Sequence, residues 1–320
     1  MTDTSFDPLP VPLAADGAER RVGVEIEFGG LQEGEAAAIA AGVFGGRAER
    51  VSEFAWAVKG ADVGDIDVYL DTAFRERASN GLLERGLDLA RVVVPVEIVL
   101  PPLHQSDLPL LDTLRRALRA AGAEGTRDGF FLGFGVHFNP EIAGEAVEDL
   151  LPTMRAFALM EDWLREQDQI DPSRRLLPFT DPWPRSFVDR IVREDPPTAA
   201  ALIDLYLEET PTRNRALDML CAFRHMDEER TMAGLPRGVS VSARPTYHYR
   251  LPDCRIDEKG WSFAYEWNRW VRVERLAATP DALDRLRSRW VEHREAILTT
   301  RFDWPGVVEE ELRAHGLLEG

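Results

Sequence analysis

The stretch VGVEIEF, residues 22–28, decides which architecture the rest of the chain must fit. Its apolar residues alternate with other residues, a pattern typical of a β-strand with one buried face. Because strand side chains alternate between faces, Glu25 and Glu27 point to the same side, with their Cα atoms about 6–7 Å apart. Burying two unpaired carboxylates would be costly. The strand therefore predicts a sheet face that is either open to water or supplied with cations.

Further strand-like segments follow, rich in Val, Ile and Phe, at residues 54–58, 65–71, 90–100, 129–138 and 238–252. A helical period over residues 108–121 separates the fourth candidate strand from the fifth. Residues 141–230 read mostly as a helical insertion broken by prolines. From about residue 259 to residue 320 the chain is again helical, with amphipathic helices predicted at 261–277, 281–298 and 307–319.

Residues 1–20 mix acids and prolines without an apolar period, so we expect a flexible leader, which leaves 21–320 as a single catalytic domain. The 56 acidic and 38 basic residues give a net charge of −18. Nucleic acid and anionic membrane are therefore poor partners, because phosphate binding needs a basic surface. The N-terminus lacks the pattern of a secretory signal, and the two cysteines show no disulfide or zinc spacing. We therefore expect a cytoplasmic protein.

Ionisable residues recur inside the other apolar strands. Glu97 interrupts the hydrophobic run VVVPVEIVL, where surface decoration is a poor explanation. His137 and Asn139 lie two residues apart in GVHFN, and His248 and Arg250 repeat this spacing in YHYRL. Four strands thus offer polar side chains to one shared surface.

Carboxylates with an imidazole and an amide oxygen suit divalent cations, and the excess of oxygen favours Mg²⁺ or Mn²⁺ over Zn²⁺. Acids combined with arginines suit phosphoryl transfer, in which metal and guanidinium groups neutralise phosphate charge. The candidate arginines are Arg213, Arg215, Arg244, Arg250 and Arg255. No P-loop, Rossmann glycine motif or nucleophile elbow occurs, so metal and arginine would have to hold the phosphates.

Five segments together resemble a known family. They are VGVEIEFGGL (22–31), VPVEIVLPPL (94–103), GFGVHFNPEI (133–142), RNRALDML (213–220) and RPTYHYRLPDCRID (244–257). In this order and spacing, over residues 22 to about 275, the chain resembles the amidoligases. That family is similar to glutamine synthetase and glutamate–cysteine ligase, within the carboxylate–amine ligase superfamily.

The resemblance implies an α+β fold with a curved, mainly antiparallel sheet of the glutamine synthetase type, flanked by helices. The active site would lie on the concave face. ATP and Mg²⁺, or Mn²⁺ in its place, would serve to phosphorylate a substrate carboxylate, and an amine would attack the acyl phosphate to form an amide. Both substrates would be small molecules or peptides, such as an amino acid.

The resemblance also implies roles for individual residues. The metal ligands would be Glu25, Glu27, Glu97, His137 and His248. The catalytic residues would be Arg250, His137 and Glu97. The nucleotide contacts would be Asn139, Arg244, Arg215 and Lys59, of which Lys59 follows Trp56 in a stretch resembling the family's W-x-V. The chain departs from the family at His248, where a glutamate is expected, and at Asp218–Met219, where an asparagine–leucine pair is common.

Two alternatives stay open from the sequence. One is a metal-dependent hydrolase or phosphotransferase that uses the same polar face. The other is a non-catalytic binding protein that has kept the fold, for which the histidine at position 248 is the motivating feature. The sequence leaves the oligomeric state open as well.

Overall fold

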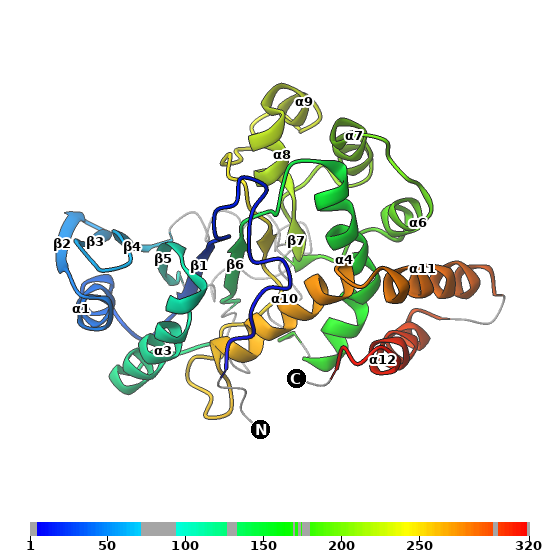
Figure 1. Ribbon diagram of the computed structural model, residues 1–320. Coiled ribbons are helices and arrows are strands. Elements are labelled where there is room, and N and C mark those ends of the chain that lie inside the picture. The colour runs from blue at the N-terminus through cyan, green and yellow to red at the C-terminus, as the bar shows by residue number, and fades with distance from the viewer. Residues whose placement is uncertain are drawn as a thin grey trace, which may run out of the picture.

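The computed structural model describes residues 5–71, 94–126, 133–168, 170–171, 174, 180–296 and 300–318. These residues form an α+β architecture in which eight antiparallel strands make one open sheet, flanked by helices (Figure 1). The order across the sheet is β2-β3-β4-β5-β1-β6-β8-β7. The strands are β1 (Val22–Phe28), β2 (Arg47–Ser52), β3 (Ala55–Lys59), β4 (Ile66–Leu70), β5 (Val96–Leu103), β6 (Val136–Pro140), β7 (Leu217–Asp218) and β8 (His248–Tyr249).

Helices connect and follow the strands. The α-helices are α1 (Glu33–Phe44), α3 (Pro109–Ala121), α4 (Val147–Gln167), α6 (Arg185–Arg193), α7 (Ala199–Glu209), α8 (Leu220–Met226), α9 (Glu228–Ala233), α10 (Phe263–Ala277), α11 (Pro280–Glu295) and α12 (Trp304–Ala314), with short 3₁₀ turns η2 (Gln105–Asp107) and η4 (Arg301–Asp303). Within the described residues, no helix combines the length and apolar character needed to cross a membrane.

The strand register gives the sheet one apolar and one polar face. Paired residues of an antiparallel sheet point to the same side. One row of such pairs runs apolar across five strands, through Trp56, Val68, Ile98, Ile26 and Val136.

The next rows on the opposite side are polar. In one row, Tyr69 pairs with Glu97, and Glu97 pairs with Glu27. In its neighbour, Val99 pairs with Glu25, and Glu25 pairs with His137. The alternation that the sequence shows in single strands is therefore continuous across the sheet.

Helices cover the apolar face. On α10, Trp267 contacts Phe138 with ring centroids 5.7 Å apart, and Trp270 contacts Tyr249 at 5.3 Å. At the other end of the sheet, α1 packs on β2 to β5, and the ring of Trp56 lies against Gly34 of this helix. Helix α10, with its buried residues Trp267 and Trp270, therefore belongs to the core.

The N-terminal segment is packed, in contrast to the flexible leader expected from its composition. The backbone of Asp7 accepts a hydrogen bond from Trp267 Nε1 and donates one to Asn268 Oδ1. Leu9 is buried, and the guanidinium of Arg20 makes two 2.8 Å bonds to the carboxylate of Glu274. Side chains of α10 thus supply the partners that the segment cannot find within itself, and Figure 1 shows the segment crossing α10.

The predicted elements are largely confirmed where the structure describes them. Strands β1, β3, β4, β5 and β6 and helices α3, α10, α11 and α12 overlap the expected ranges, with ends that differ by a few residues in several of them. Residues 72–93 and 127–132, which include parts of two predicted strands, lie outside the described residues. The expected strand over 238–252 is wrong in length, since only His248–Tyr249 is a strand and Pro245 has no N–H to donate to a ladder.

Candidate active site

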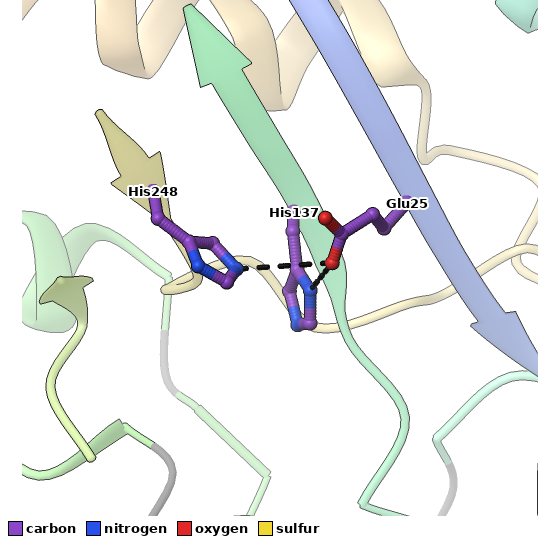
Figure 2. A group of neighbouring side chains, drawn as sticks. All are labelled: Glu25, His137 and His248. Carbon is purple, nitrogen blue, oxygen red and sulfur yellow. Dashed lines mark hydrogen bonds and ion pairs between the residues drawn. The ribbon is translucent and has the colours of Figure 1, made fainter. Parts of the chain in front are cut away.

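Three side chains from three neighbouring strands meet on the polar face. Figure 2 shows Glu25 of β1, His137 of β6 and His248 of β8 converging, with both imidazoles turned toward the same carboxylate. Oε2 of Glu25 lies 2.8 Å from Nδ1 of His137 and 3.8 Å from Nε2 of His248. The two rings stand edge to face with centroids 5.2 Å apart. The register explains the meeting, since Glu25 pairs with His137, and Phe138 pairs with Tyr249.

Glu25 is held as a carboxylate. Burial alone would raise its pKa, but the hydrogen bond from His137, together with the other polar and charged groups around it, Arg244 among them, holds the pKa of Glu25 well below its usual value. Nη1 of Arg244 lies 3.3 Å from Oε1, which also accepts a 3.0 Å bond from Nδ2 of Asn139. An ionised carboxylate only accepts hydrogen bonds, so His137 donates from Nδ1.

The imidazole of His248 is neutral, and its ring nitrogens make no hydrogen bond within the described structure. Burial, and then the nearby Arg250, lower the pKa of His248 well below its ordinary value, so the ring is neutral at neutral pH. Both ring nitrogens are buried, and neither has a hydrogen-bond partner among the residues that the structure describes. A buried polar group without a partner is costly, which is a reason to expect a ligand at this ring.

A second group next to the first consists of carboxylates alone. Oxygens of Glu27, Asp71 and Glu97 lie within 4.8 Å of one another, and all three residues are buried. Burial, and then the charges of Glu27, Glu25 and Asp71, raise the pKa of Glu97 well above its usual value. One oxygen of Glu27 accepts a 2.8 Å bond from the backbone N–H of Gly135, and the other lies 4.0 Å from Nε2 of His137.

Cationic side chains border both groups. Arg250 is buried, and its Nη1 donates to the backbone oxygen of Arg213 at 2.8 Å. Burial lowers the pKa of Arg250, opposed by the charge of Asp218. Within the described structure, Nε of Arg250 and Oδ1 of Asn139 are buried without hydrogen-bond partners. Donors and acceptors thus remain available beside the acids.

The donor sets fit divalent cations. Three buried carboxylates match the preference of Mg²⁺ for oxygen ligands, and the group of Glu25, His137 and His248 mixes oxygen with imidazole nitrogen. Packed carboxylates of like charge, and a neutral buried imidazole with open nitrogens, are what a cation would stabilise. The arginines supply the complementary sites for anionic oxygens.

The structure brings together most of the predicted site residues. Those found on this shared surface are Glu25, Glu27, Glu97, His137, Asn139, Arg244, His248 and Arg250. What they bind or catalyse is argued below as a proposal.

The other candidates have partners elsewhere. Lys59 forms an exposed ion pair with Asp65 at 2.7 Å. Arg215 donates to Thr210 Oγ1 and to the backbone oxygen of Pro182. Trp56 lies on the apolar face against α1. Arg255 pairs with Asp168 at 2.7 Å.

Sequence reasoning did not single out two members of the site. Asp71 directly follows β4, and Tyr69 of β4 hydrogen-bonds Glu97. The alternation of Asp67, Tyr69 and Asp71 in DIDVYLD was a readable signal, because residues two apart share one face of a strand.

One of the comparisons with known proteins found a match. Residues 18–272 match the model of a family described as "Putative amidoligase enzyme". No curated protein and no solved structure matches the chain. The matched range contains every strand that the structure describes and the two groups of possible metal ligands given above. The chain therefore belongs to the amidoligase family, in keeping with a C–N bond-forming ligase.

Proposed function

We propose that the protein is an ATP- and Mg²⁺-dependent carboxylate–amine ligase of the glutamine synthetase type, which forms an amide through an acyl phosphate. The observation that carries the proposal is the polar face itself, where two groups of possible metal ligands lie beside the guanidinium groups of Arg244 and Arg250. The substrates we propose are a small amino acid or peptide carboxylate and an amine.

In this proposal, different residues of the polar face would bind the metal ions and the nucleotide. Glu27, Asp71 and Glu97 would hold one Mg²⁺, and Glu25, His137 and His248 would hold another. Bound there, Mg²⁺ would neutralise the charge of the phosphate oxygens. Arg244 and Asn139, which already contact Glu25, would bind the nucleotide beside these ligands.

The proposed reaction has two steps: transfer of the γ-phosphoryl group to the substrate carboxylate, and displacement of phosphate by the amine. A carboxylate oxygen of the substrate attacks the γ-phosphorus of ATP, and the bond from this phosphorus to ADP breaks. Arg250 stabilises the charge on the transferred phosphoryl oxygens, a role that suits a buried guanidinium whose Nε is unpaired in the described structure. The amine nitrogen next attacks the acyl carbon, phosphate leaves, and the nitrogen loses a proton.

Burial of the site protects the intermediate. His137, Asn139 and Glu27 are 4%, 3% and 6% exposed, so little water reaches the side chains of the polar face. Exclusion of water limits hydrolysis of a reactive acyl phosphate and strengthens the electrostatic interactions around it.

The test uses the purified full chain with Mg²⁺, ATP and a panel of amino acids and peptides. Hydroxylamine replaces the amine, so that an acyl phosphate is trapped as a hydroxamate, and the active carboxylate is then supplied with ¹⁸O. The proposal expects ADP formation that depends on the carboxylate, and transfer of one ¹⁸O atom into phosphate. ADP formation indifferent to every carboxylate would instead indicate a hydrolase or phosphotransferase, and nucleotide binding without turnover a binding protein.

A matched pair of variants ties the activity to the site. E27Q removes a charge from the group of three carboxylates on the polar face, whereas E49Q makes the same change on edge strand β2 of the same sheet, where the side chain of Glu49 is 42% exposed. We expect E27Q to abolish turnover and E49Q to retain it. Equal turnover by both variants would contradict the assignment of the site.

A further inference from the structure

A third group of ligand atoms lies on the other side of His248. Atoms of Asp218, Cys221 and His248 lie within 4.8 Å of one another, and all three residues are buried. Asp218 of β7 pairs with His248 of β8 in the sheet, and Cys221 follows in the first turn of α8. The pairing of β7 with β8 and the start of α8 just after β7 therefore hold the three residues together.

Asp218 and His248 each direct an atom that could bind a metal toward the other residue. Oδ1 of Asp218 accepts the backbone N–H of Leu220 at 2.9 Å, and Oδ2 lies 3.8 Å from Nδ1 of His248. In the described structure Nδ1 is buried without a hydrogen-bond partner, so an unpaired polar atom of a residue only 2% exposed faces this group.

We propose that Asp218, Cys221 and His248 form a binding site for a thiophilic divalent cation, Zn²⁺ above all, separate from the oxygen-rich groups on Glu25 and Glu27. One thiolate, one imidazole and one carboxylate are the ligand types that Zn²⁺ takes in tetrahedral sites, whereas Mg²⁺ avoids sulfur. Zinc–ligand bonds of about 2.0–2.3 Å place neighbouring ligand atoms roughly 3.3–3.8 Å apart. The 3.8 Å between Asp218 and His248 would have to shorten by only a few tenths of an ångström to reach the spacing of an oxygen–nitrogen pair.

Three arginines act against a cation here: Arg250 stays in its buried place, whereas Arg213 and Arg244 must turn aside. Nε of Arg213 lies 3.4 Å from Asp218 Oδ2, and Nη2 of Arg244 lies 3.9 Å from the sulfur of Cys221. Their side chains are 30% and 36% exposed, so both reach the surface and their guanidinium groups can turn toward water. The thiol of Cys221 gives up its proton to solvent as the metal–sulfur bond forms.

The shared histidine links this site to the proposed active site. A neutral imidazole has one lone pair, so a metal on Nδ1 leaves the proton on Nε2, the nitrogen that lies 3.8 Å from Glu25. His248 then cannot ligate a cation on the Glu25 side. Zinc occupancy would therefore antagonise Mg²⁺-dependent turnover, a consequence that rests on the proposed function, whereas the zinc site itself does not.

Cobalt spectroscopy tests the site without any assay of activity. Co²⁺ is added to the EDTA-treated full-length protein, and the absorbance is followed for a thiolate-to-cobalt charge-transfer band and the visible bands of a tetrahedral ion. We expect both to saturate at one equivalent per chain and to be abolished by Zn²⁺. C221S should remove the charge-transfer band, whereas C254S should keep it, because Cys254 is also buried but lies outside the group.

A second variant covers the case in which C221S fails to fold. D218N keeps the thiol and replaces the oxygen donor, and it should weaken Co²⁺ binding at least about tenfold, since even outer-shell partners of metals cost that much. A wild-type protein without the charge-transfer band, or a band that survives C221S, would overturn the proposal. So would unchanged affinity in D218N. An active ligase without the band would refute the zinc site alone.

Discussion

Glu27 and Glu97 lie directly opposite each other on β1 and β5, although only 6% and 7% of these residues is exposed. Burial and the neighbouring acids raise the pKa of Glu97 well above its usual value. Like charges opposite each other across a strand pair are destabilising. The metal-free fold thus carries an electrostatic cost at a site whose oxygens suit a cation.

We therefore expect E97Q to stabilise the EDTA-treated protein by roughly 1 kcal/mol at neutral pH, the upper range for cross-strand charge pairs. The pKa of Glu97 is higher in the folded chain than in the unfolded chain, so the folded state binds more protons between these two values. Wild-type stability should fall as the pH rises through this interval, and E97Q should flatten the fall. Urea unfolding at a series of pH values measures both effects.

The control for this prediction is E49Q, since the side chain of Glu49 is 42% exposed on β2 and forms an ion pair with the exposed Arg47. It should shift the unfolding free energy little, as exposed ion pairs contribute about 0–1 kcal/mol. A loss of stability in E97Q would show that the carboxyl group of Glu97 has a structural role.

Added Mg²⁺ should raise the thermal stability of the EDTA-treated protein. A ligand that binds only the folded state adds about 2.7 kcal/mol at a concentration 100 times its Kd. Calorimetric melting with and without Mg²⁺ measures the shift, which E27Q should reduce by the contribution of the ion at Glu27, Asp71 and Glu97, and which E49Q should preserve. A shift of equal size in E27Q would place the ion away from the carboxylate group.

The sequence predicts the polar face better than it predicts the connections around it. The alternation in VGVEIEF fixes which face Glu25 and Glu27 share, because the side-chain period of a strand is two. The sequence pattern does not predict helix α1, because its alanines and glycines form no distinct apolar stripe. It does not predict strands β2 and β7 either, since β2 is polar at the sheet edge and β7 has only two residues.

The features that the sequence does not predict, such as Asp71 in the site and the packed N-terminal segment, depend on contacts between distant segments. Asp71 joins Glu27 and Glu97 because β4 pairs with β5, and nothing local in DIDVYLD announces that pairing. The N-terminal residues looked flexible because their partners, Trp267, Asn268 and Glu274, lie some 250 residues away. A composition argument detects only partners within the segment itself.

Breaking the buried pair of Arg20 and Glu274 should destabilise the fold by about 3–5 kcal/mol, because it leaves one charge buried without its partner. The predicted variant is R20M, and urea unfolding measures the loss. The double variant R20M/E274M should recover much of it, since neither charge then remains. R47M, which breaks an exposed pair, should cost less than about 1 kcal/mol. A double variant no more stable than R20M would mean that other bonds of Arg20, such as that to the backbone of Glu141, dominate.

Gly135 is required by close packing beneath the site. A Cβ here would collide with the guanidinium of Arg174 and lie 3.3 Å from Nε2 of His137. Arg174 cannot yield easily, because it is 2% exposed and donates to the backbone oxygens of Arg250, Leu251 and Pro252. We expect G135A to destabilise the protein by roughly 1–3 kcal/mol, the usual cost of overpacking, and to lower turnover by displacing His137.

The matched control has the opposite sign. Gly42 lies in helix α1 with open space around its Cα, so G42A should stabilise the protein by about 0.5–1 kcal/mol. Thermal and urea unfolding of both variants, with the amidoligase assay on each, separate packing from chemistry. If G135A were as stable as wild type and equally active, Arg174 would have to move freely, and the packing that we assign to this part of the polar face would be wrong.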